Sequence, residues 1–168
     1  MFNRIKAVFF SATGTTEKIC KAIAEELAKS LSLPLEVTDF TLPAGRQVPP
    51  VFEPADLVVF GTPVYAGRVP NVLLPFIKSL EGRGAAAIPV VLFGNRNFDD
   101  ALAELRDLLE ADGFRTVAGA AFVGEHAFSR TLAAGRPDAE DLEKAKSFAA
   151  ALAARLHAAG ELPHPVEV

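Results

Sequence analysis

Apolar residues follow two alternating patterns along the chain. Short runs rich in β-branched and aromatic residues predict strands at residues 5–10, 35–40, 56–60, 88–93 and 117–123. Longer segments with helical spacing or helix-type ends predict helices at residues 15–31, 70–80, 98–111 and 138–159. Continuous apolar runs are typical of strands that are buried on both faces. The alternation of strand and helix therefore predicts an α/β fold, a doubly wound parallel sheet with right-handed crossovers.

Turn and breaker residues set the expected limits of these elements. Proline and glycine are frequent in residues 41–53, which are expected to form a loop, and Pro75 is expected to kink the second helix. The last helix should end at Gly160. The 168 residues therefore suit one domain, residues 1–160, followed by a frayed tail at residues 161–168.

Composition and charge narrow the class of protein. Half of the residues are apolar and 23% are charged, which excludes a disordered chain. The formal net charge of −4 and the absence of Lys or Arg runs disfavour binding to nucleic acid or to an anionic membrane. No apolar stretch has the length of a membrane span or a signal peptide, so we expect the cytoplasm. Cys20 is the only cysteine, which excludes an internal disulfide and a multi-cysteine metal site, and its helical context predicts a core position.

Ligands of open parallel sheets bind beyond the carboxyl ends of the strands, where the strand order reverses. The loop after the first strand is dense in hydroxyl groups and opens a long helix; its residues are Ser11, Ala12, Thr13, Gly14, Thr15 and Thr16. Free N–H groups at a helix start, together with these hydroxyls, make a phosphate cradle. Because the loop lacks the Lys of GxxxxGK[ST] and is not GxGxxG, it suits one terminal phosphomonoester. The alternative is an ordinary N-cap rich in Ser and Thr.

Two later loops at the same edge suit a flat, polar ring. The loop at residues 61–70 holds Tyr65, the only tyrosine in a chain without tryptophan, and Gly67, where the backbone is free to turn. Tyr65 is a candidate stacking platform, and the alternative is that it only covers the loop. The loop after the fourth strand has polar groups for the edge of a heterocycle, in Gly94, Asn95 and Arg96. The alternative there is a turn that caps the next helix, with Phe98 as an anchor.

These loops resemble those of the flavodoxin family. The residues that match its phosphate loop, [ST]-x-T-G-x-T, are Ser11, Thr13, Gly14 and Thr16. The residues that match its second loop, G-x-P-x-[WY], are Gly61, Pro63 and Tyr65. The order of elements agrees over essentially the whole chain. The resemblance implies a three-layer sandwich around a five-stranded parallel sheet in the order 2-1-3-4-5, with non-covalently bound FMN at the switch point.

The functional residues of the family carry over by position. The resemblance implies that the FMN phosphate is held by Ser11, Thr13, Gly14, Thr15 and Thr16. It implies that Tyr65, with its neighbours Pro63 and Val64, contacts the isoalloxazine ring. The Ala66–Gly67 peptide would reorient to meet the flavin N5–H on reduction. The pyrimidine edge would be lined by Gly94, Asn95 and Arg96, with Phe98 nearby. The resemblance implies no catalytic residue and no metal.

Three stretches resemble a subgroup in which a flavodoxin domain is often fused to a two-cluster ferredoxin: GTPVYAGRVPN, FGNRNFDDAL and GEHAFSR. With one cysteine, this chain would be the flavodoxin part alone, so its electron partner, such as a ferredoxin or a reductase, would be a separate protein. One departure from the family is that Arg68, Arg96 and Arg130 lie in these loops. A cation near the flavin N1 would stabilise the anionic reduced form and raise the second reduction potential.

Three functions fit this topology. The first is electron transfer through FMN, which needs no catalytic acid or base because the cofactor carries the chemistry. The alternative is an FMN-dependent NAD(P)H or quinone reductase, in which the loop arginines would hold an anionic substrate, although no separate dinucleotide site is visible. A phospho-acceptor regulator is disfavoured because the loops after the first and third strands lack its acids. We expect an electron carrier and leave open whether the protein is also an enzyme.

Overall fold

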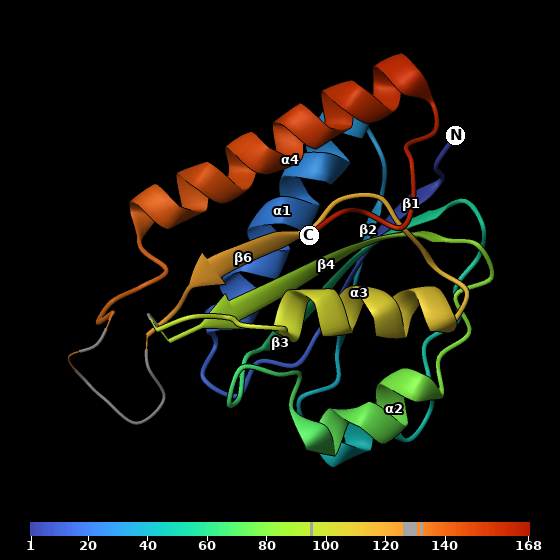
Figure 1. The fold of residues 1–168 in the computed structure, drawn as a ribbon. Coiled ribbons are helices and arrows are strands. Elements are labelled where there is room, and N and C mark those ends of the chain that lie inside the picture. The colour runs from blue at the N-terminus through green and yellow to red at the C-terminus, as the bar shows by residue number, and fades with distance from the viewer. Residues whose placement is uncertain (95, 126–130, 132) are drawn as a thin grey trace.

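A parallel β-sheet runs through the protein with helices on both of its faces, as a computed structural model of residues 1–168 shows (Figure 1). The structure describes all residues except 95, 126–130 and 132. The strands are β1 (Arg4–Phe9), β2 (Leu35–Asp39), β3 (Asp56–Pro63), β4 (Ala86–Phe93), β5 (Arg115–Thr116) and β6 (Ala120–Val123). Their order is β2-β1-β3-β4-β5, and β6 also pairs with β4. The predicted strand order is therefore confirmed.

The strand order reverses at β1. Ala7 pairs with Val37 of β2 on one side and with Val59 of β3 on the other. The chain thus moves from β1 outward to β2 and returns on the opposite side of β1. The carboxyl ends of β1 and β3 therefore flank the switch point, where open α/β sheets bind their ligands.

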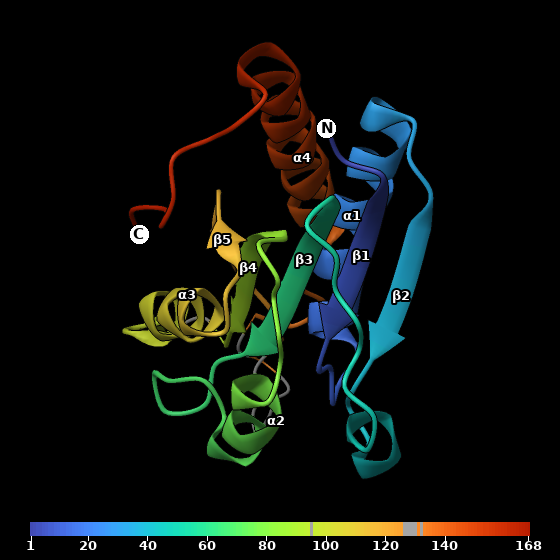
Figure 2. The same ribbon diagram turned by 90° about the vertical axis from the view of Figure 1, so that its right-hand side faces the viewer.

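Two helical layers cover the sheet. The helices are α1 (Thr15–Leu31), α2 (Leu74–Lys78), α3 (Ala101–Ala111) and α4 (Ala139–Ala159), with 3₁₀ turns η1 (Pro43–Arg46) and η2 (Asn71–Leu73). Figure 2 shows α1 and α4 on one face and α2 and α3 on the other. Val59 of β3 packs in the core with Ile23 of α1, and Val58 packs in the opposite core with Leu105 of α3. Strand β3 thus feeds two buried layers, which explains its continuous apolar run.

Two helices are shorter than the sequence predicts. The segment at residues 70–80 is a 3₁₀ turn followed by the short helix α2. Pro75 stands in the first turn of α2, because a proline is tolerated there and not farther along a helix. The third helix begins at Ala101 rather than at residue 98, since Asp99 has a left-handed φ of 45°.

The predicted fifth strand is split into β5 and β6. The register to β4 shifts by one residue between them, because Ala87 pairs with Thr116 whereas Val90 pairs with Ala120. Pro89 of β4 lies at this break, and its missing N–H removes one hydrogen bond of the ladder. The prediction of one continuous strand is therefore corrected to two short strands joined by a bulge.

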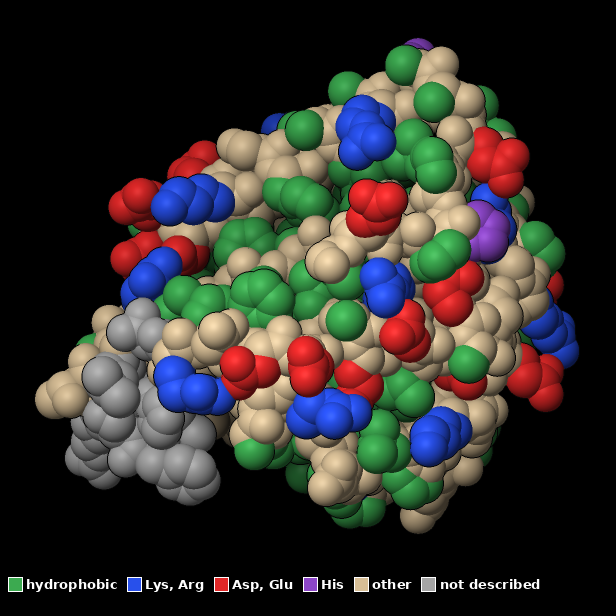
Figure 3. All heavy atoms as spheres, in the orientation of Figure 1, with side chains coloured by type: hydrophobic (Ala, Val, Ile, Leu, Met, Phe, Trp, Pro, Cys, Tyr) green, Lys and Arg blue, Asp and Glu red, His purple; other side chains and the backbone are tan. Residues whose placement is uncertain are grey.

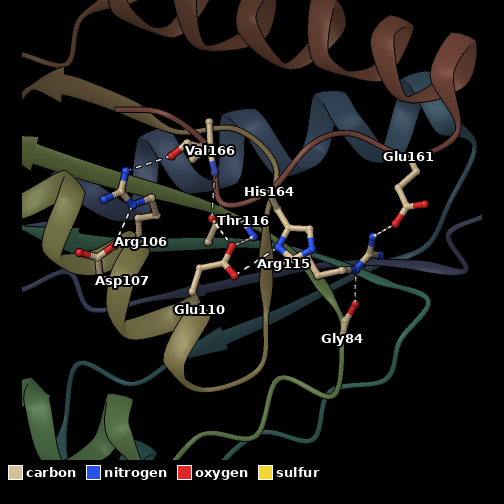
Figure 4. A network of polar contacts seen from close by, with 9 residues as sticks. All are labelled: Gly84, Arg106, Asp107, Glu110, Arg115, Thr116, Glu161, His164 and Val166. Carbon is tan, nitrogen blue, oxygen red and sulfur yellow. Dashed lines mark hydrogen bonds and ion pairs between the residues drawn. The ribbon is translucent and has the colours of Figure 1, made fainter.

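Residues 161–168 pack along the edge of the sheet, and the prediction that they fray is wrong (Figure 4). Arg106 of α3 donates from Nη1 to the carbonyl of Val166 at 3.1 Å, and the N–H of Val166 donates to Thr116 Oγ1 at 3.3 Å. Leu162 is buried against the core. The prolines of this tail exclude a helix, but its backbone groups find partners on α3 and β5.

Burial and charge outside the sheet edge agree with the sequence. Cys20 lies in the core, as predicted, and burial raises the pKa of its thiol. No helix in the described part of the chain has both the length and the apolar character needed to cross a membrane. Acidic and basic side chains are interspersed over the face that carries α3 (Figure 3). That face therefore offers no patch of a single sign to a polyanion.

Candidate functional site

A pocket of about 580 Å³ opens at the carboxyl ends of β3, β4 and β6, beside the start of α1. Its volume lies within the range of about 300–1,000 Å³ that is typical of small-molecule sites. Four loops supply its lining residues: Ala12, Thr13, Thr15, Thr16, Pro63, Val64, Tyr65, Ala66, Leu92, Phe93, Gly94, Gly124 and Glu125. The pocket thus lies where the topology predicts a ligand.

The first turn of α1 leaves backbone donors free at this pocket. Gly14 is the N-cap, with a φ of 86° that favours glycine, and no side chain caps the helix from this position. The N–H groups of Thr15 and Thr16 precede the first intrahelical bond, and no described residue accepts from them. The positive end of the helix dipole lies here as well. This helix start can therefore bind an anion.

Threonine side chains surround these donors. Thr13 Oγ1 and Thr15 Oγ1 lie 3.5 Å apart, so both hydroxyls can turn toward one shared acceptor. Thr16 is only 1% exposed and lines the pocket. Among the described residues, no Lys or Arg lines the pocket. The cradle is therefore neutral and depends on N–H and O–H donors.

Ser11 shapes this loop from outside the pocket. Its hydroxyl oxygen accepts the N–H of Glu17 at 3.0 Å, and its own N–H donates to Thr41 Oγ1 at 2.9 Å. Ser11 therefore satisfies one of the free donors of α1, which is the capping alternative left open by the sequence. Neither Ser11 nor Gly14 lines the pocket, so their part in holding a phosphate stays a prediction.

Tyr65 begins a tight hairpin turn at the wall of the pocket. Tyr65 N donates to the carbonyl of Arg68 at 3.0 Å, and Arg68 N donates back to the carbonyl of Tyr65 at 3.1 Å. Between them, Ala66 and Gly67 have φ values of 52° and 74°. Two positive φ angles at the central positions define a type I′ turn. Tyr65 lines the pocket and is 44% exposed, so its ring is accessible to a ligand.

The remaining walls include residues that the sequence did not single out. Leu92 and Phe93 are the last residues of β4, and Gly124 and Glu125 follow β6. Gly124 lies so close to α1 that a Cβ there would stand 3.2 Å from the Cβ of Thr15. The rule that ligands bind beyond strand ends applies equally to the loop after the last strand, and this signal could have indicated Gly124 and Glu125.

Other predicted site residues lie outside the lining of the pocket. Gly67 packs against Asp99, and Phe98 stacks near Phe93 with ring centroids 5.5 Å apart. Arg96 is largely exposed and pairs with Asp99. Asn95, together with His126 and Arg130, lies outside the described residues, so its predicted role is neither supported nor opposed.

Glu125 is the only charged side chain of the described residues that lines the pocket. Its N–H donates to the carbonyl of Arg136 at 2.8 Å. The guanidinium of Arg136 makes two hydrogen bonds to Asp141, at 2.9 and 2.6 Å, and these lower the pKa of Asp141 to about 2. The start of α4 therefore anchors the wall that carries Glu125.

Known proteins of the same architecture agree with this geometry. The flavodoxin domain family matches residues 7–124. Among solved structures, the Streptococcus pneumonia TIGR4 flavodoxin is 24% identical, with a TM-score of 0.60 over 90% of this chain and 99% of its own. Oxidised Flavodoxin 1 from Bacillus cereus is 21% identical, with a TM-score of 0.63 over 88% of this chain and 95% of its own. These identities show the fold alone. No curated protein matches the chain.

The family match covers more than half of the chain. It includes the loop before α1, the Tyr65 hairpin, the end of β4 and Gly124. The observed strand order and the position of the pocket at the switch point agree with it independently. This chain belongs to the flavodoxin family.

Proposed function

We propose that this protein binds FMN non-covalently in the pocket and carries electrons between separate redox proteins. Membership of the flavodoxin family implies a flavin cofactor. The observation that carries the choice of FMN is the neutral anion site at the start of α1, where Thr15 and Thr16 keep free N–H groups. FMN combines one terminal phosphate with a flat ring, which suits a pocket that joins this cradle to an aromatic wall.

Each wall of the pocket has a role in this proposal. Thr13, Thr15 and Thr16 would donate hydrogen bonds to the phosphate, and no cation is needed because the helix start supplies partial positive charge. Tyr65 would lie against the ring system. Apolar Val64 and the neighbouring strand ends would exclude water from it. Bound FMN would supply reversible one- and two-electron chemistry.

We also propose that the Ala66–Gly67 peptide is the movable group at this site. The peptides around it are held, since Tyr65 and Arg68 exchange backbone hydrogen bonds and the carbonyl of Gly67 accepts the N–H of Asp100 at 3.1 Å. The carbonyl of Ala66 and the N–H of Gly67 have no partner among the described residues. This peptide can therefore turn without breaking a hydrogen bond and offer its C=O to the N5–H of a reduced flavin.

The charges around the pocket favour a carrier over a reductase. The reductase alternative depends on Arg68 and Arg96 holding an anionic substrate. Both guanidinium groups pair with carboxylates, Glu104 and Asp99 respectively, and neither lines the pocket. The lining carboxylate of Glu125 repels an anion. The partner that we propose is a separate redox protein, such as a ferredoxin or a reductase, in the cytoplasm.

The test is a visible absorption spectrum of the protein after loading with FMN and desalting. Flavin absorption that stays with the protein supports the proposal, and complete loss of flavin at micromolar protein contradicts it. Stepwise anaerobic reduction then separates the two functions. A long-wavelength band from one-electron-reduced flavin supports a carrier, whereas direct two-electron reduction with NADH turnover by the pure protein supports a reductase.

A further inference from the structure

One side chain of α3 fixes the Tyr65 hairpin from outside the pocket. Glu104 Oε1 accepts the N–H of Val69 at 2.9 Å, and Glu104 Oε2 pairs with the guanidinium of Arg68. A single carboxylate therefore holds two consecutive residues on the strand that leaves the turn. Hydrogen bonds of this charge-assisted kind are about twice as strong as neutral ones.

The environment of Glu104 makes this contact stronger than an ordinary surface ion pair. The side chain is 14% exposed and lies in the first turn of α3, where the helix dipole stabilises a carboxylate. Val69 is 1% exposed, so without Glu104 its N–H would lose its partner with little access to water. Arg68 is 59% exposed, and solvent screens its part of the contact. The bond to Val69 is therefore the stronger half.

Further contacts secure the turn on the same base. The N–H of Asp100, the N-cap of α3, donates to the carbonyl of Gly67 at 3.1 Å. Gly67 approaches the preceding residue so closely that a Cβ would lie 2.5 Å from Asp99 Oδ2. The partners of the hairpin thus all belong to α3 or to the residues just before it. The start of α3 is the platform on which the hairpin rests.

We propose that Glu104 is a positioning residue of the flavin site, which holds Tyr65 in place and thereby sets the affinity for flavin. The proposal rests on the proposed function. Glu104 does not line the pocket and reaches it only through the hairpin. Because Tyr65 and Arg68 are joined by both backbone hydrogen bonds of the turn, a displacement of Arg68 is passed directly to Tyr65.

Tyr65 reports on its own loop, because the chain has no other tyrosine and no tryptophan. Its fluorescence anisotropy can therefore be measured in the FMN-free protein, independently of any flavin. E104A removes both halves of the contact. E104Q keeps an acceptor for the N–H of Val69, and R68A removes only the ion pair.

D107N is the matched control. Asp107 lies one turn farther along α3, is exposed, and pairs with its neighbour Arg106 rather than with the hairpin. It therefore changes the charge of the same helix without touching the contact. Urea unfolding of each variant shows whether it folds, and if E104A does not, E104Q and R68A decide.

E104A is expected to lower the anisotropy of Tyr65 and to weaken FMN binding about tenfold, the equivalent of one charge-assisted hydrogen bond. Riboflavin binding should weaken by the same factor, because the hairpin acts on the ring and not on the phosphate. E104Q and R68A should give intermediate values, and D107N should match the wild type.

Unchanged anisotropy in E104A overturns the proposal. A lower anisotropy with unchanged FMN affinity also overturns it, because the hairpin would then be ordered by Glu104 without setting flavin binding. If the wild-type protein binds no FMN, the proposed function fails on its own account. The anisotropy comparison still decides in that case whether Glu104 holds Tyr65.

Discussion

Gly61 of β3 lies directly against the thiol of Cys20 on α1: a Cβ atom at residue 61 would stand 2.1 Å from Cys20 Sγ. The same atom would lie 2.9 Å from Cγ2 of Thr16, in the first turn of the helix. The absence of a side chain at Gly61 therefore lets α1 approach the sheet. That approach brings the start of the helix, with its free N–H groups, to the pocket.

G61A should lower the free energy of unfolding by at least about 2 kcal/mol, because a methyl group cannot enter this contact without moving α1. Urea denaturation measures the change. In a C20A background the same substitution should cost less, since the sulfur atom that it meets is gone. Equal costs in both backgrounds would mean that the helix moves freely and that the contact does not position it.

T16V should weaken FMN binding about tenfold while leaving riboflavin binding unchanged, since the lost hydroxyl is a donor to the phosphate. Quenching of flavin fluorescence on binding gives both dissociation constants. Riboflavin serves as the internal control, because it has the ring and lacks the phosphate. An equal loss for both ligands would assign Thr16 to the fold and not to the phosphate cradle.

The pocket was predictable from the sequence because its signals are local. The hydroxyl loop around Thr15 and the lone Tyr65 follow apolar strands directly, and the parallel sheet brings strand ends together. The clamp on the hairpin is not local. Val69 and Glu104 lie 35 positions apart, and only the packing of α3 makes them partners. The sequence places Arg68 in the loop but does not say where its side chain points.

The same limit explains the errors in the elements. Pro89 disturbs the strand beside it rather than its own, and that effect depends on a pairing register that apolar patterns do not specify. The tail contains two prolines, which favour disorder locally. Thr116 and Arg106 nevertheless give Val166 hydrogen bonds that no local pattern announces.

Asp141 should make the protein sensitive to acid. Its hydrogen bonds to Arg136 lower its pKa from 3.8 to about 2, so the folded state binds the proton less readily than the unfolded chain does. The resulting stability is present above about pH 4 and is lost as the pH falls toward 2. D141N should remove about 2 kcal/mol at neutral pH and flatten this part of the profile. A wild-type profile that is equally flat between pH 4 and 2 would contradict the assignment.

Asp112 should have the opposite effect. Its Oδ2 is buried without a hydrogen-bond partner among the described residues, and burial raises its pKa from 3.8 to about 6. The folded state therefore keeps a proton that the unfolded chain releases, and the free energy of unfolding falls as the pH rises from about 4 to 6. D112N should stabilise the protein by roughly 1 kcal/mol at pH 7, after allowance for solvent screening. Thermal melts at pH 4 and pH 7 test this, because the gain should be present only at the higher pH.

Ala66 should restrain the movable peptide of the hairpin. Turning the Ala66–Gly67 peptide by half a rotation converts a type I′ turn into a type II′ turn, whose first central position favours glycine. Ala66 occupies that position, so the turned state carries backbone strain of about 1 kcal/mol. A66G should remove this strain and raise the potential of the first reduction step by about 40 mV, since about 59 mV corresponds to a tenfold change for one electron. Redox titration measures this shift.

G67A is the comparison variant for A66G. Its methyl group would meet Asp99 and would sit at a φ of 74°, so the turn itself should be disrupted and flavin affinity should fall. A66G should leave the affinity for oxidised FMN close to that of the wild type, because the I′ turn accepts glycine at both positions. An unchanged potential in A66G, with affinity also unchanged, would mean that the Ala66–Gly67 peptide keeps one orientation in both redox states.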